Sequence, residues 1–266
     1  MEIIGYILAI VMGFSLGLLG GGGSILTVPI LVYVLNIEPV LATAYSLFVV
    51  GSTSVVGAMR KNKLGLVDLK TGLSFAIPSL IAVFFTRYTI VPAIPEQLWE
   101  FNNFVLSKEI AIMIFFAIIM LLASYSMIRG RKEGEVDPEP KPLNIPLVLV
   151  EGLVVGIITG LVGAGGGFLI VPALVVLVGL PIKIAVGTSL LIIALKSLIG
   201  FLGDLGSGQD IDWLFLVIFS SFSIVGMYLG IYTTKFVKGA SLKKGFGWFV
   251  LIMGIFILLK ETVLNA

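Results

Sequence analysis

Two glycine runs are the residues of this chain whose type and spacing best suggest chemistry. They are Gly20-Gly21-Gly22-Gly23-Ser24 and Gly163-Ala164-Gly165-Gly166-Gly167, each inside an apolar stretch that ends in a proline. The stretches Gly13–Pro29 and Gly156–Pro172 share one offset at both ends (156 − 13 = 143 and 172 − 29 = 143). Consecutive glycines unwind a helix at low steric cost, and a helix that starts behind them exposes amides without an intrahelical partner. Because such an end carries partial positive charge, the two runs predict a binding site for a small anion.

Glycine runs also occur in nucleotide-binding loops and in closely packed helices. A nucleotide-binding loop of the Walker type ends in G-K-[ST], and no lysine follows either run. A dinucleotide fingerprint needs a strand-turn-helix setting, whereas the flanks here are apolar over membrane-like lengths. The remaining alternative is that glycine only lets helices pack closely in lipid.

Lys196 is a second candidate, because it lies inside the apolar segment Ile182–Leu202. A charge buried in lipid is costly, so an ionisable residue inside a membrane segment is a candidate for neutralising an anion or carrying a proton. The sequence also allows, and slightly favours, a second interpretation in which the long lysine stem reaches the interface near Gly203. The repeat-equivalent residue is Thr53, so a cationic site would be asymmetric.

Composition sets the class of protein. Hydrophobic residues make up 58% of the 266 residues and charged ones 12%, which indicates an integral membrane protein. The net charge of +2, without a contiguous basic patch, gives no reason to expect nucleic acid as a partner. The chain has no cysteine and no histidine, which excludes cysteine nucleophiles and thiolate metal sites and removes the commonest general base. We therefore expect no metal, no cofactor and no enzymatic activity.

The elements that position these residues follow from the roughly 20 apolar residues that a helix needs to cross a bilayer. Each glycine run is flanked by apolar pieces shorter than this, Ile3–Leu19 and Ser24–Leu35 in the first case and Ile145–Val162 and Phe168–Leu180 in the second. These pieces predict broken helices or re-entrant hairpins. Val91–Ser107 predicts an extramembrane loop or a short interfacial helix. Full spans are predicted at Val40–Met59, Thr71–Val91, Glu109–Met127, Ile182–Leu202, Trp213–Phe236 and Gly245–Leu259.

The chain divides into two homologous halves in this interpretation. Residues 1–129 form the first transmembrane repeat, and residues 145–266 form the second. Residues 130–144 are rich in proline, glycine and charge, and are predicted to be a cytoplasmic linker. The repeat continues past the glycines, since Ser46-Leu47 matches Ser189-Leu190 and Gly57 matches Gly200 at the same offset.

Charge predicts how the halves are oriented. Short loops rich in Lys and Arg favour the cytoplasmic side. Arg60, Lys61, Lys63 and Lys70 cluster after the first full span, whereas the matching loop 203–212 carries three aspartates and no basic residue. Asp204 in that loop is expected to be solvated at the interface. Opposite charge in matching loops favours inverted repeats with an external N-terminus. The predicted fold is an all-α, polytopic transmembrane helical bundle of two such repeats, with broken or re-entrant helices at the glycine corners.

The chain resembles the TauE/SafE sulfite exporter family of membrane permeases. The resemblance lies in G-x-x-G-G-G-G-S-x-x-x-V-P (Gly17–Pro29), in G-x-x-G-A-G-G-G-x-x-x-V-P (Gly160–Pro172), and in the segments Ala42–Phe48 and Ala185–Leu191. It covers nearly the whole chain. The family is associated with sulfite and with organosulfur anions such as sulfonates, so the resemblance implies an anion permease.

The resemblance also implies substrate-binding positions beyond the glycine runs and Lys196. These are small hydroxyl residues on the helices that follow each corner, whose alternative role is to bond to a carbonyl one turn back. They are Thr43, Ser46, Thr188 and Ser189.

The sequence thus predicts a secondary transporter in the cell membrane that moves a small anion by alternating access. The substrate is expected to be a sulfur oxyanion such as sulfite, or a sulfonate. An anion channel is the alternative, and an intramembrane enzyme a more distant one. The expected partners are the anionic substrate and the lipid bilayer. A coupling proton and a homo-oligomer are both compatible with the sequence.

Overall fold

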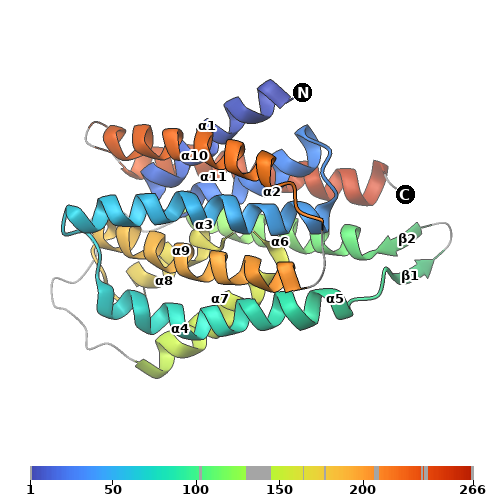
Figure 1. Ribbon diagram of the computed structural model, residues 1–266, viewed down its shortest axis with the longest axis horizontal. Coiled ribbons are helices and arrows are strands. Elements are labelled where there is room, and N and C mark those ends of the chain that lie inside the picture. Colours follow the sequence, from blue (N-terminus) through green and yellow to red (C-terminus); the bar gives the residue numbers. More distant parts are fainter. Residues whose placement is uncertain are drawn as a thin grey trace.

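The computed structural model shows an elongated bundle of helices with the two chain ends at the same end of the molecule (Figure 1). It describes residues 2–101, 104–129, 145–163, 165–176, 178–206, 210–234, 236 and 239–264. The predicted linker 130–144 and Ala164 lie outside the described residues.

The first part of the chain forms α1 (Glu2–Leu19), the 3₁₀ turn η1 (Gly22–Leu26), α2 (Thr27–Pro29), the π-turn η2 (Ile30–Val34), α3 (Pro39–Lys63), α4 (Leu69–Phe85), the π-turn η3 (Thr86–Ile90), α5 (Val91–Ala93), β1 (Gln97–Phe101), β2 (Phe104–Ser107) and α6 (Lys108–Arg129). The second part forms α7 (Ile145–Val162), α8 (Gly167–Val176), α9 (Ile182–Gly206), α10 (Trp213–Thr233), α11 (Gly239–Leu259) and the π-turn η4 (Lys260–Leu264).

Five helices of the described chain are long and apolar enough to cross a membrane. The predicted full spans lie on α3, on the α4–α5 segment, and on α6, α9, α10 and α11, with bounds that differ by a few residues. Pro39 at the start of α3 and the Asp68 and Asp212 caps of α4 and α10 explain where these helices begin. The five candidates are Pro39–Lys63, Leu69–Ala93, Lys108–Tyr125, Ile182–Gly206 and Trp213–Thr233.

The centre of the bundle is the antiparallel pair α3 and α9 (Figure 1). A Cβ built on Gly57 would lie 3.1 Å from Leu190, and one built on Gly200 would lie 3.3 Å from Leu47. Residue numbers therefore rise along α3 as they fall along α9. The two helices have the same length and the same offset as the glycine runs (182 − 39 = 143 and 206 − 63 = 143).

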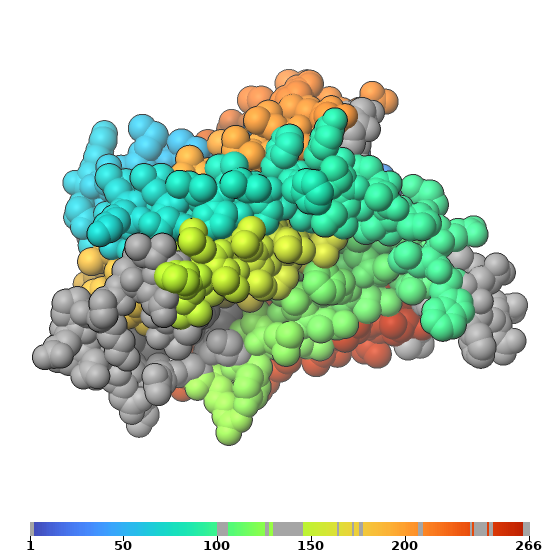
Figure 2. Space-filling view, turned by 90° about the horizontal axis from the view of Figure 1, so that it is seen from below, coloured from blue at the N-terminus to red at the C-terminus, as the bar shows by residue number. Residues whose placement is uncertain are grey.

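Glycines allow the outer helices to pack backbone to backbone. A Cβ on Gly226 of α10 would overlap the carbonyl oxygen of Ile10 in α1, and one on Gly156 of α7 would lie 2.5 Å from the carbonyl oxygen of Ser79 in α4. Small residues at such contacts are typical of helix packing in lipid, where close approach takes the place of the hydrophobic effect. Figure 2 shows α7 lying along α4, with α6 beside it.

Both glycine runs reverse the direction of the chain. Gly20 (φ +76°) and Gly163 (φ +71°) follow the last residues of α1 and α7 in the left-handed conformation that favours glycine. After Gly20 the chain returns along α1, since a Cβ on Gly5 would lie 2.6 Å from Leu35. The predicted breaks in the two helices are therefore present among the described residues.

The segment after α4 departs from the expectation of a loop or short interfacial helix. The helix continues through the π-turn η3 to Ala93, and the chain then forms the antiparallel hairpin β1–β2, where Glu100 pairs with Val105. Leu98-Trp99 and Val105-Leu106 supply the bulky, strand-favouring residues. This hairpin is the one sheet in the described residues.

Candidate functional site

The two glycine corners meet in the middle of the bundle. Gly21 lies so close to Gly167 that a Cβ on either would overlap the backbone of the other. Each corner also reaches the central helix of the other half. Gly20 packs against Val186 of α9, and Gly163 packs against Thr43 of α3, two contacts that the offset of 143 residues relates to each other. All glycines of both runs are buried.

The hydroxyls expected near the corners differ in what they contact. Ser189 Oγ lies 2.8 Å from the carbonyl oxygen of Gly20 at the first corner and 2.8 Å from that of Val186 one turn back, so it combines both roles. Thr43 donates to the carbonyl of Val40 one turn back, which is the alternative role. Thr188 accepts a bond from the amide of Asp68, and so fastens the start of α4.

Two further serines complete the expected set. Ser24 donates to the carbonyl of Gly21 at 2.7 Å and closes the first corner locally. Ser46 is fully buried, and its hydroxyl has no hydrogen-bond partner in the part of the chain that the structure describes. Ser46 therefore remains available to a polar guest.

Lys196 lies at the second corner rather than at the interface. Its side chain is 1% exposed, and Nζ donates to Thr159 Oγ1 of α7 at 2.9 Å. A Cβ built on Gly166 would lie 2.7 Å from Nζ. The interpretation that the stem extends toward Gly203 is wrong in this structure. The reason is that α8 packs on α9 here and Thr159 of α7 lies within reach of Nζ, so the stem turns sideways into the corner.

Two sources of positive charge therefore converge at one point. The first amides of α8 begin at Gly167, the residue after Gly166, whose built Cβ would lie 2.7 Å from the ammonium nitrogen of Lys196. No carboxylate of the described residues pairs with Lys196. Ser197 Oγ, also buried and without a partner in the same residues, lies 3.5 Å from the position of a Cβ on Gly165. An amide end, a cation and a free hydroxyl together suit an oxyanion.

The equivalent place at the first corner carries no charge. Thr53 occupies the repeat position of Lys196, and its hydroxyl donates to Ser223 Oγ of α10 at 2.9 Å. The two corners share a left-handed glycine, Gly20 in one and Gly163 in the other, but they differ in charge. Of these two equivalent positions, only the one at the second corner carries a cation.

Sequence reasoning missed a buried ion pair between α4 and α9. Arg87 Nε lies 3.2 Å from Asp204 Oδ2, and the two side chains are 0% and 2% exposed. Asp204 is thus inside the bundle, because α9 continues four residues beyond the predicted end at Leu202. Arg87 gave a signal that could have been used, since it is a lone arginine at the end of an apolar segment.

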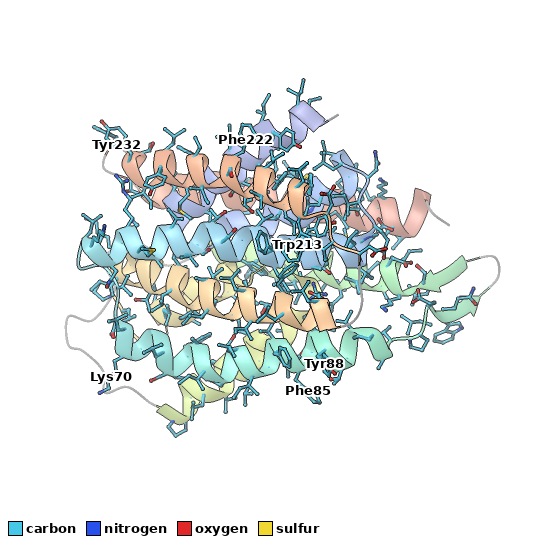
Figure 3. All side chains as sticks on the ribbon, viewed as in Figure 1. Lys70, Phe85, Tyr88, Trp213, Phe222 and Tyr232 are labelled. Carbon is cyan, nitrogen blue, oxygen red and sulfur yellow. The ribbon has the colours of Figure 1, made fainter. Side chains whose placement is uncertain are left out.

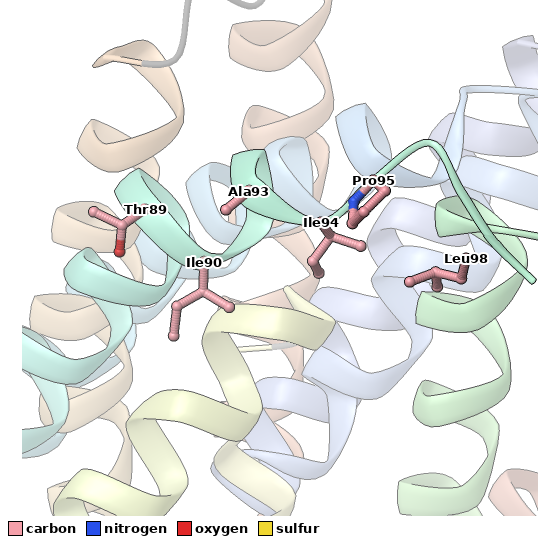
Figure 4. A pocket seen from close by; sticks show the side chains of 6 residues that line it. All are labelled: Thr89, Ile90, Ala93, Ile94, Pro95 and Leu98. Atoms are coloured by element: carbon pink, nitrogen blue, oxygen red, sulfur yellow. The ribbon is translucent and has the colours of Figure 1, made fainter.

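A surface pocket lies away from the corners. It is lined by apolar side chains and Thr89 where α5 leads into β1 (Figure 4). Its wall carries no charged group, so it offers nothing to an anion. Within the described residues no cluster of three or more Asp, Glu, His or Cys could hold a metal ion.

These features define a polytopic helical membrane protein with a charged, glycine-lined centre. Residues 6–257 match the family described as Sulfite exporter TauE/SafE. The chain belongs to this family, which is one of membrane transporters.

Relatives in several organisms are described as probable membrane transporter proteins. A "Probable membrane transporter protein" of Xylella fastidiosa is 28% identical over 255 residues, covering 94% of this chain and 92% of its own. The "Probable membrane transporter protein YunE" of Bacillus subtilis is 29% identical, over 79% of this chain and 81% of its own. One from Methanocaldococcus jannaschii is 35% identical, over 43% of this chain and 45% of its own. No solved structure matches the chain.

Proposed function

We propose that this protein is a secondary transporter of the cell membrane, not an enzyme, and that it moves a small sulfur oxyanion or organosulfonate. The anion binds at the second corner, between the first amides of α8 and Lys196. Sulfite is the first substrate to test, because the family description names a sulfite exporter.

The observation that carries this proposal is the buried ammonium group beside Gly166. A lysine surrounded by apolar helices is costly unless an anion shares its site. Thr159 supplies one hydrogen bond but no charge. A bound oxyanion would neutralise Lys196 and accept bonds from the helix end and from Ser197.

We further propose that the two halves are inverted repeats that expose the corners alternately to the two sides of the membrane. The equal lengths and opposite directions of α3 and α9 support this arrangement. The two chain reversals start from opposite ends of the bundle and meet at Gly21 and Gly167, which supports two re-entrant hairpins. The burial of both corners supports a carrier rather than an open channel.

The proposal is tested by the thermal stability of the purified protein with sulfite, thiosulfate, methanesulfonate, acetate and divalent cations. We expect the sulfur anions to raise the melting temperature. A response to a cation and to none of the anions would exclude the anion site. Uptake into proteoliposomes separates the two modes of transport, because a carrier gives saturable exchange and a channel gives large single-channel currents.

Lys196→Gln provides the decisive variant. Glutamine is one bond shorter than lysine and keeps N–H donors, but it removes the charge. The apparent affinity for sulfite is therefore expected to fall at least about tenfold. Lys70→Gln, which removes the same charge from an exposed lysine at the end of the bundle (Figure 3), is the matched control and should bind as the natural protein does. Equal binding by both variants would remove Lys196 from the site.

A further inference from the structure

Arg87 is the second cation buried in this bundle, and its ion pair leaves most of its donors unused. Nε faces Asp204, but Nη1 and Nη2 have no hydrogen-bond partner among the described residues, although the side chain is fully buried. A guanidinium group has five N–H donors in a planar fork that fits two oxygens of one oxyanion. The hydroxyl of the neighbouring Thr86 is also buried without a partner in the same part of the chain. An unsatisfied fork in an apolar bundle is costly, so this arrangement needs an explanation.

Arg87 and Lys196 lie along one line through the bundle. Thr159 of α7 binds Lys196, and the next residue, Gly160, packs on Thr86, with a built Cβ 2.7 Å from the Thr86 Cβ. On the other side, a Cβ on Gly203 of α9 would lie 2.9 Å from the Arg87 Cβ. Gly203 follows Lys196 by two turns of α9, or about 10 Å along the helix axis.

The direction of this line shows on which side of the second corner Arg87 lies. It leads from the second corner toward the end of the bundle where α9 ends and where η3 continues into α5. In Figure 3 the labelled neighbour Tyr88 lies toward that end of α4, opposite to Lys70. An anion that leaves the corner in this direction meets Arg87 before it leaves the bundle.

We propose that Arg87 is a second oxyanion-binding residue, which receives the anion between the corner and the end of the bundle that carries the β1–β2 hairpin. The inference rests on the proposed function, since it concerns the path of the same substrate. The oxyanion binds bidentately to the guanidinium nitrogens and accepts a bond from Thr86. Asp204 competes for the same guanidinium group and holds it when no substrate is present. Because Asp204 faces Nε, the anion binds at the free Nη1 and Nη2, and the carboxylate of Asp204 weakens this binding by neutralising the same guanidinium group.

A purely structural ion pair makes a different prediction. If Arg87 and Asp204 only hold α4 against α9, each single neutral variant leaves a buried charge uncompensated, and removal of both charges repairs the defect. If Arg87 binds the anion, the two single variants act in opposite directions, and the double variant stays defective. The sign of the Asp204→Asn effect thus separates the two roles.

The test measures sulfite binding to the purified full-length protein by titration calorimetry. Arg87→Gln is expected to weaken binding about tenfold, and Asp204→Asn to tighten it about threefold or more, because the competing carboxylate is gone. Arg87→Gln/Asp204→Asn should bind as weakly as Arg87→Gln alone. The controls Arg60→Gln and Asp210→Asn remove the same charges from exposed positions and should leave binding unchanged.

Several results would overturn the proposal. One is that Arg87→Gln/Asp204→Asn binds sulfite as tightly as the natural protein does. Another is that Asp204→Asn binds sulfite more weakly, and a third is that Arg87→Gln binds it unchanged. If Arg87→Gln does not fold, Arg87→Lys keeps the charge without the fork, and it must still weaken sulfite binding for the proposal to stand. Failure of the function itself looks different, because the natural protein would then not bind sulfite and Lys196→Gln would change nothing. If sulfite binding is lost in Lys196→Gln but unchanged in Arg87→Gln, the site at Lys196 stands and only the role of Arg87 is rejected.

Discussion

Lys196 shows how much a single side chain depends on the packing around it. From the sequence alone, a lysine near the end of an apolar segment has water within reach of its stem. In the bundle, α9 extends to Gly206 and α8 packs on it, so the stem has a glycine corner beside it instead. The same four extra residues take Asp204 away from the interface and bring it to Arg87.

The corner itself can be tested at Gly163. A Cβ at this position would lie 2.5 Å from the carbonyl oxygen and 2.6 Å from the Cα of Thr43, and φ is positive. Gly163→Ala is therefore expected to suffer both the strain of a left-handed alanine, about 1–2 kcal/mol, and a clash with the backbone of α3. We expect a lower melting temperature and no stabilisation by sulfite, measured on the purified protein.

Gly179→Ala separates the two causes in this experiment. Gly179 has φ +77° but nothing within 4 Å of a built Cβ, so only the strain applies. This variant should lose a little stability and keep its response to sulfite. If Gly163→Ala behaved in the same way, the close contact between the second corner and α3 would have no role in binding.

At the scale of the elements, α1 and α10 depend on glycine for their contact. A Cβ on Gly226 would overlap the carbonyl oxygen of Ile10 and lie 2.8 Å from the amide nitrogen of Phe14, and backbone atoms cannot move aside. Gly226→Val should destabilise the bundle by about 1–3 kcal/mol more than Gly254→Val does. Gly254 is the matched control, since the nearest atoms to its Cβ belong to the side chains of Leu121 and Met120. Equal melting temperatures of the two variants in detergent would contradict the close packing of α1 on α10.

Helix positions were predictable, whereas several contacts were not. Hydropathy located α3 and α9 to within a few residues, because a long apolar run bounded by charges allows few alternatives. The breaks at the glycine runs followed from the left-handed conformation that glycine accepts at Gly20 and Gly163. The β1–β2 hairpin was missed, since prolines and polar residues around Trp99 hide the alternation of its short strands. Arg87 was missed because its partner lies on α9, and a pair so far apart in the sequence leaves no local pattern.

For the whole molecule, charge differs between the two ends of the bundle. At one end, the last turn of α3 and the first turn of α4 carry Arg60, Lys63 and Lys70. At the other end, the segments before α3 and α10 and after α5 carry Glu38, Asp212 and Glu96. Both chain ends lie at the acidic end (Figure 1). If basic loops stay in the cytoplasm, the acidic end with the β1–β2 hairpin faces outward. The proposed anion-binding residue Arg87 then lies on the outer side of the second corner.

This orientation is open to a direct test because the natural chain contains no cysteine. Trp99, which is 69% exposed on the hairpin, and the exposed Lys70 mark the two ends. In intact cells, a membrane-impermeant thiol reagent should label Trp99→Cys and not Lys70→Cys, and permeabilised cells should show labelling of both. The natural protein, which has no thiol, gives the background. Labelling of Lys70→Cys alone in intact cells would reverse the orientation, and Arg87 would then receive the anion on its way between the corner and the cytoplasm.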